Sequence, residues 1–87
     1  MEIYFKKNIH FTRLMSAAGR LREFNFRQFK NHDETGFSID VVDDRGERIM
    51  FRMLKVEDKW KIPVQKLPEW IIKKENVFHQ VIEEETH

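Results

Sequence analysis

The segment from Arg20 to Phe29 (RLREFNFRQF) places cationic and aromatic side chains close together. If it forms one regular strand, its side chains alternate between two faces, and one face carries Arg20, Arg22, Phe24, Phe26 and Gln28. Arginine neutralises phosphate and aromatic rings stack on bases, so this pattern is typical of single-stranded nucleic-acid binding. We therefore expect a nucleic-acid-binding site formed by Arg20, Arg22, Phe24, Phe26 and Arg27.

The same segment has a simpler explanation, which the sequence leaves open. In that explanation Phe24 and Phe26 are core residues beneath a helix, and the arginine side chains extend past the sheet edge into water. Exposed rings beside the arginines would favour a binding site, whereas buried rings would favour the core.

Other chemically reactive patterns are weak. Glu75, His79 and Glu83 recur every four residues and would share one helical face, but a single exposed helix supplies no second shell of ligands. Ordinary surface charge pairing explains them better. The sequence contains no phosphate-binding loop, dinucleotide-binding glycine pattern, zinc-ligand motif, nucleophile elbow or calcium loop. We predict no enzyme activity, no cofactor, no metal site and no small-molecule substrate.

The elements that position these residues are strands in the first two thirds of the chain. Residues 37–42 and 49–54 alternate with the period of two that strands require. The intervening Asp43–Gly46 predicts a hairpin, because Asp bonds its own backbone in a turn and Gly accepts a positive φ. A short strand at residues 60–62 follows, and Pro63 ends it because proline cannot donate to a ladder.

From Pro68 onward the apolar residues recur three and four apart, which predicts a helix that starts at this proline. Together with a strand at residues 20–29, the pattern predicts an α+β fold in a single domain, 1–87. An antiparallel β-meander of about four strands, within residues 20–63, packs against one C-terminal α-helix at residues 68–84.

Residues 1–19 are expected to be either poorly ordered or a segment that covers the sheet. Phe11 to Gly19 predicts a helical turn or two, with Gly19 as the left-handed stop. The sheet face away from the helix has surplus apolar residues, namely Val42, Met50, Leu54 and Val56. Either a homodimer covers them, or the N-terminal segment does, through Tyr4, Phe5, Phe11, Leu14 and Met15.

Composition bounds the class of protein. The 87 residues have a formal net charge of +1, but residues 1–32 hold seven Lys or Arg against two Glu, which would attract an anionic partner. There is no cysteine, no signal-peptide pattern and no stretch long enough to span a membrane. We therefore expect a cytoplasmic protein without a membrane partner.

The element order resembles that of a family of single-stranded nucleic-acid-binding proteins. FRQFKN (26–31), FSIDVVD (37–43), further strands and a helix opened by LPEW (67–70) are similar to the strand-rich meander and C-terminal helix of the coactivator positive cofactor four, Whirly and PUR proteins. The resemblance spans roughly Arg20 to Ile82. It implies binding of single-stranded DNA or RNA on the sheet, pairing of two copies through the helix, and a binding strand that contains Arg22, Phe24, Phe26 and Arg27.

Two functions remain open from the sequence. The first is a small non-enzymatic binding module that takes single-stranded DNA or RNA on the basic aromatic strand. The alternative is a protein-interaction or self-associating (homodimer) module with no nucleic-acid binding.

Overall fold

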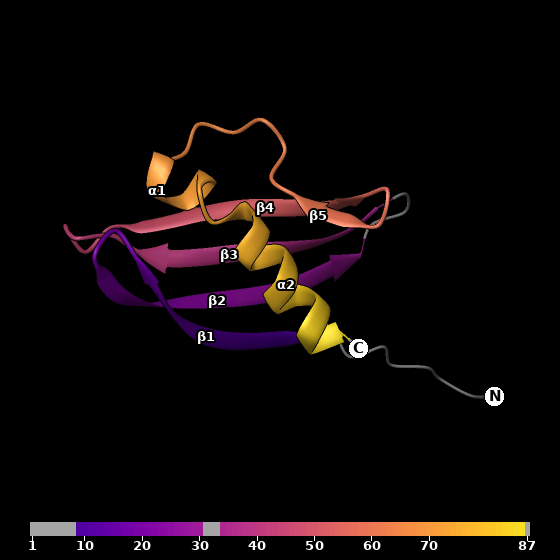
Figure 1. Ribbon diagram of the computed structural model, residues 1–87, viewed down its shortest axis with the longest axis horizontal. Coiled ribbons are helices and arrows are strands. Elements are labelled where there is room, and N and C mark those ends of the chain that lie inside the picture. The colour runs from indigo at the N-terminus through magenta and orange to yellow at the C-terminus, as the bar shows by residue number, and fades with distance from the viewer. Residues whose placement is uncertain (1–8, 31–33, 87) are drawn as a thin grey trace.

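A computed structural model of the chain describes residues 9–30 and 34–86. Within them, five strands form one antiparallel sheet whose spatial order follows the chain from β1 to β5 (Figure 1). The strands are β1 (His10–Ala17), β2 (Arg20–Lys30), β3 (Thr35–Val42), β4 (Arg48–Val56) and β5 (Lys59–Lys61), and two helices follow, α1 (Glu69–Ile72) and α2 (Glu75–Thr86). The α+β class and the meander are confirmed.

The turn between β3 and β4 is the hairpin predicted at Asp43–Gly46. The Asp43 carboxylate accepts hydrogen bonds from the backbone N–H groups of Arg45 (2.9 Å) and Glu47 (2.8 Å). Gly46 has the positive φ, 81°, that such a turn requires. The side chain of one aspartate therefore fixes the geometry of the whole turn.

β1 is the strand that the sequence did not predict, and it makes the sheet five-stranded instead of about four-stranded. Residues 10–17, expected to be poorly ordered or to cover the sheet, pair with β2 from His10 opposite Arg27 to Ala17 opposite Arg20. The helix predicted from Phe11 to Gly19 is wrong. Ala18 (φ 53°) and Gly19 (φ 75°) form a two-residue hairpin turn, and a positive φ at glycine suits a hairpin as well as a helix end. Tyr4 and Phe5 lie outside the described residues.

The single helix predicted at residues 68–84 is divided in two. The N–H of Lys74 bonds the carbonyl of Ile71, three residues back (2.9 Å). The α-helical pattern of bonds to the fourth residue back therefore ends at this point, which ends α1. α-Helical hydrogen bonding resumes in α2, where the N–H of Phe78 bonds the carbonyl of Lys74, four residues back (2.9 Å). This break lets α2 take its own direction diagonally across the sheet (Figure 1).

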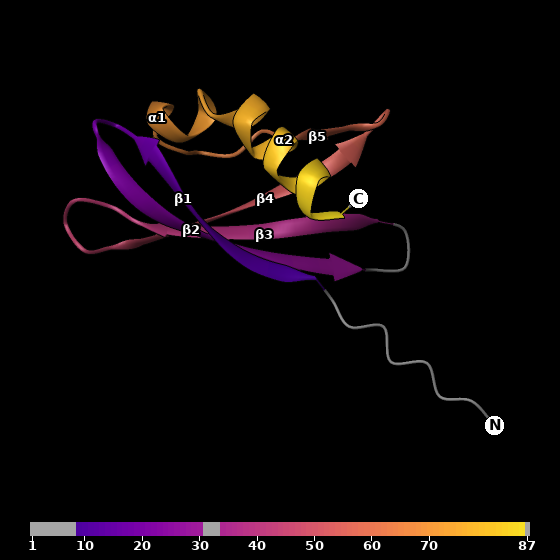
Figure 2. The ribbon, with the colours of Figure 1, turned by 60° about the horizontal axis from the view of Figure 1, so that its bottom comes forward.

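Both helices lie on the same face of the curled sheet (Figure 2). We call this the inner face and the opposite one the outer face. The ring of Phe78 on α2 lies among the sheet aromatics, 5.3 Å from the ring of Phe24 and 5.5 Å from that of Phe51 between centroids. The buried residues around it are Ala17, Phe24, Phe26, Phe37, Ile39, Val41, Phe51, Met53, Trp60, Ile71, Val81 and Ile82. The core therefore lies entirely on the inner face, and the outer face is bare in the described part of the chain.

Candidate binding surfaces of the sheet

Phe24 and Phe26 are core residues. Their side chains point to the inner face beneath α2 and are 0% and 1% exposed. Phe26 also stacks on Phe11 of β1 at 4.7 Å between ring centroids, with 12° between the ring planes. Of the two explanations that the sequence leaves open for these rings, the core is the one observed. Neither ring face is accessible to a base in this arrangement.

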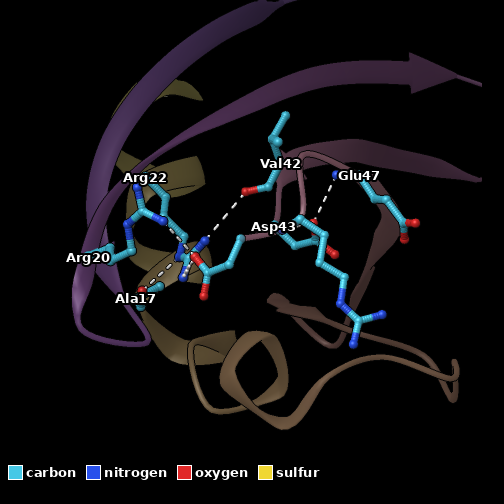
Figure 3. A network of polar contacts seen from close by, with 8 residues as sticks. Ala17, Arg20, Arg22, Val42, Asp43 and Glu47 are labelled. Atoms are coloured by element: carbon cyan, nitrogen blue, oxygen red, sulfur yellow. Dashed lines mark hydrogen bonds and ion pairs between the residues drawn. The ribbon is translucent and has the colours of Figure 1, made fainter.

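Arg22 is buried on the same face and is bound by the protein itself (Figure 3). Its Nε donates to the carbonyl of Ala17 (2.8 Å), Nη1 to that of Val42 (3.5 Å) and Nη2 to Asp44 Oδ1 (3.0 Å). The guanidinium carbon lies 4.6 Å from the centroid of the Trp70 ring, which is a cation–π contact. Arg22 therefore joins the two hairpin ends of the sheet to α1.

Arg20 and Asp44 extend this network into solvent. Arg20 Nη1 lies 2.9 Å from Asp44 Oδ1, and both side chains are largely exposed. The hydrogen bond from Arg22, and then that from Arg20, lowers the pKa of the Asp44 carboxyl from its ordinary value. The carboxylate thus neutralises two of the arginines that the sequence assigned to nucleic acid.

Arg27 lies on the other side of the sheet. It is exposed and follows Phe26 by one residue, so its side chain points to the outer face. The five predicted binding residues are therefore not one surface: Phe24 and Phe26 are in the core, Arg20 and Arg22 are paired at a hairpin end, and Arg27 is on the outer face.

Four exposed apolar side chains gather on one half of the outer face, and we call them the outer-face cluster: Leu14, Leu21, Val42 and Met50. They are between 45% and 68% exposed. Leu14 is one diagonal position from Leu21 across β1 and β2, and Val42 has the same relation to Met50 across β3 and β4. A hollow of about 310 Å³ is lined by Leu21 and Val42 together with charged and polar side chains, among them Glu23, Asn25 and Arg48. Water-exposed apolar side chains that gather on one face form a surface that association would stabilise.

The outer face is also basic. By strand alternation its Lys and Arg side chains, in the described strands, outnumber its carboxylates, Glu23 and Asp40. Asp40 is already engaged, because it accepts a hydrogen bond from Asn25 (3.0 Å) and lies 4.0 Å from Arg48. The cations are Arg27, Arg48, Arg52, Lys59 and Lys61. They come from three different strands, so no run of basic residues marks this face in the sequence.

Phe29 is the aromatic residue of the strands that points to this outer face. It is half-buried and lies opposite Gly36, where an added Cβ would collide with its ring. The guanidinium carbon of Arg52 is 5.8 Å from the ring centroid. Glycine is therefore required at position 36 so that the ring can lie flat against the sheet.

The edge of the sheet at β5 is closed by α2, through the three residues that recur every four positions. Glu75 Oε2 accepts from the N–H of Ile62 (2.7 Å), His79 Nδ1 from the N–H of Trp60 (3.0 Å), and Glu83 Oε2 from the Trp60 indole (3.3 Å). The side-chain amide of Gln65 continues this edge by bonding the N–H and carbonyl of Arg52. The helical row therefore serves as a cap for a strand edge.

Across residues 9–30 and 34–86, no cluster of three acidic or histidine side chains is arranged to hold a metal ion. Within the same residues, no helix is long and apolar enough to cross a membrane. No known family model, curated protein or solved structure matches this chain.

Proposed function

We propose that this chain is a small non-enzymatic interaction module that binds a protein partner on the outer face of its sheet. The observation that carries the proposal is the outer-face cluster. Both helices pack on the inner face, whereas Leu14, Leu21, Val42 and Met50 are exposed on the opposite side, where Leu21 and Val42 also line a hollow.

The composition of this face favours a protein segment with apolar and acidic side chains. Exposed aliphatic side chains suit an apolar anchor, and the cations on the same face suit carboxylates. A nucleic acid would gain most from stacking on rings. The strands place only Phe29 on this face within the described residues, and its ring is half-buried beside Arg52.

Single-stranded nucleic acid is the second candidate, and the surplus of cations on the outer face favours it. Arg27 lies on β2, and Arg48 and Arg52 lie on β4 on the other side of β3, so a phosphate backbone that crosses the sheet could contact cations on both strands. Of the predicted nucleic-acid-binding residues, Arg27 is the one that this candidate retains. The resemblance in element order to positive cofactor four, Whirly and PUR proteins points to the same class of ligand.

The test uses a random peptide library displayed on phage and selected against the immobilised full chain. Selected peptides are synthesised with a fluorescent label, and their affinity is measured by anisotropy. We expect apolar residues interspersed with Asp and Glu. Met50→Ser should weaken binding by about ten-fold, because it removes an apolar contact without changing charge.

Ile72→Ser is the matched control, since Ile72 is similarly exposed but lies on α1, away from the outer face. Equal weakening by both variants would contradict the proposal. A labelled single-stranded oligonucleotide, titrated across a salt series, tests the second candidate with Arg27→Gln and Arg52→Gln. Tight oligonucleotide binding that falls with salt and is lost in these variants, without peptide binding, would replace the first candidate by the second.

A further inference from the structure

The two edges of the sheet differ, and the difference points to a second partner surface. Edge strands expose unpaired N–H and C=O groups, which proteins usually protect with a cover, charges or proline. The β5 edge has such a cover in α2 and Gln65. In the described part of the chain, no element pairs with the outside of β1 (Figure 1).

The register shows which backbone groups β1 leaves open. The N–H of Gln28 bonds the carbonyl of Ile9 (2.8 Å), and the pairing continues without a bulge from His10 to Ala17. Odd-numbered residues of β1 therefore face β2, and even-numbered residues direct their N–H and C=O groups away from it. The open groups belong to His10, Thr12, Leu14 and Ser16.

β1 also lacks the usual protection against edge pairing. It is eight residues long and contains no proline, glycine or lysine. Its one arginine, Arg13, points to the inner face, where it is bound by Glu84 (2.7 Å) and Glu85 (3.0 Å) of α2. Leu14, beside these open groups, exposes its side chain to water. An edge with these properties is suited to receive another strand.

We propose that the β1 edge binds a second copy of this chain, through antiparallel pairing of β1 with its equivalent. A two-fold axis at Leu14 pairs Leu14 with itself and Thr12 with Ser16 of the second copy, so that the open groups of these three residues are satisfied. Leu14 of each copy then meets the other on the outer face, next to Leu21. Arg13 faces Met15 of the second copy, so no like charges lie opposite each other.

The edge favours a second copy over a face-to-face dimer because of charge. Two outer faces brought together would oppose Arg27, Arg48 and Arg52 with the same cations of the other copy. Edge pairing instead joins the two sheets side by side and leaves the hollow open. This proposal concerns the backbone edge of β1, which shares only Leu14 with the outer-face cluster, so either proposal can fail alone.

The first test measures backbone amide exchange by NMR on the unmodified chain at several protein concentrations. We expect the N–H groups of Thr12, Leu14 and Ser16 to become protected as concentration rises, while those of Phe11 and Arg13, already bonded to β2, stay protected throughout. Rapid exchange of the first set at every concentration would overturn the proposal. Protection that is independent of concentration would assign the edge to another segment of the same chain and would also overturn it.

The second test compares Leu14→Lys with Leu21→Lys by sedimentation velocity. Both residues are exposed on the outer face to a similar degree, but only Leu14 lies on the edge strand. We expect Leu14→Lys to raise the dimer dissociation constant by at least about ten-fold, since it places like charges opposite each other, and Leu21→Lys to change it much less. Equal effects would identify a face-to-face dimer and refute edge pairing.

Discussion

Replacing Arg22 by methionine separates a structural role for this arginine from a ligand-binding one. Arg22 is 7% exposed, and its guanidinium donates to two backbone carbonyls and lies over the Trp70 ring. Methionine fills much of the same space but donates nothing. Leaving a buried carbonyl without a donor costs about 1–3 kcal/mol, and loss of a desolvated cation–π contact costs about 1–2 kcal/mol. We expect Arg22→Met to lower the free energy of unfolding by about 2–5 kcal/mol.

Urea unfolding followed by circular dichroism measures this loss as a shift of the midpoint. Arg20→Met is the control, because Arg20 pairs with the same carboxylate but in open solvent, and its loss should move the midpoint far less. The reasoning would be refuted if Arg22→Met unfolded at the same urea concentration as the unmodified chain. Loss of ligand binding without loss of stability would instead assign Arg22 to a binding surface.

Three further outcomes follow from the fold. Phe24→Ala should destabilise by about 3–5 kcal/mol in the same urea assay, because the buried ring packs against Phe78 and its removal leaves a cavity. The turn between β4 and β5 holds Glu57 (φ 50°) and Asp58 (φ 67°) in left-handed backbone, so an Asn-Gly pair there should raise the thermal unfolding midpoint by relieving strain. The pKa of Asp44 is lowered from 3.8 by Arg22 and Arg20, so its contribution to stability is complete above that pH and is lost as pH falls below it through the native pKa. Asp44→Asn should therefore flatten the acid arm of a stability–pH profile measured by urea unfolding.

The sequence predicts an element correctly where the residues near it are compatible with only one local structure. Asp43 and Gly46 specify a hairpin, and the structure has that hairpin with the expected side-chain bonds. Gly19 is compatible with both a helix end and a hairpin, so the residues before it predict a helical turn as readily as a strand, and local sequence does not specify β1. The alternation of residues 10–17 becomes a strand because β2 supplies a partner for it, which is a long-range effect.

The contacts of the candidate binding residues depend on residues far away in the sequence even more strongly than the strands do. Nothing within a few positions of Arg22 shows that Asp44 and Trp70 will surround it. The row of Glu75, His79 and Glu83 predicts a solvated face, whereas its partners are the backbone and indole N–H groups of Trp60 and the backbone N–H of Ile62, more than ten residues away. The outer-face cations are likewise assembled from separate strands.

The central claim is that the outer face of the sheet is the surface that binds. The most direct measurement is a methyl NMR titration of the full chain with the highest-affinity peptide selected from the library. We predict that the methyl signals of Leu21, Val42 and Met50, which are exposed on the outer face, shift together as the peptide is added. Shifts confined to Ile72 and Val77 on the helices, with the outer-face methyl signals unchanged, would contradict the claim.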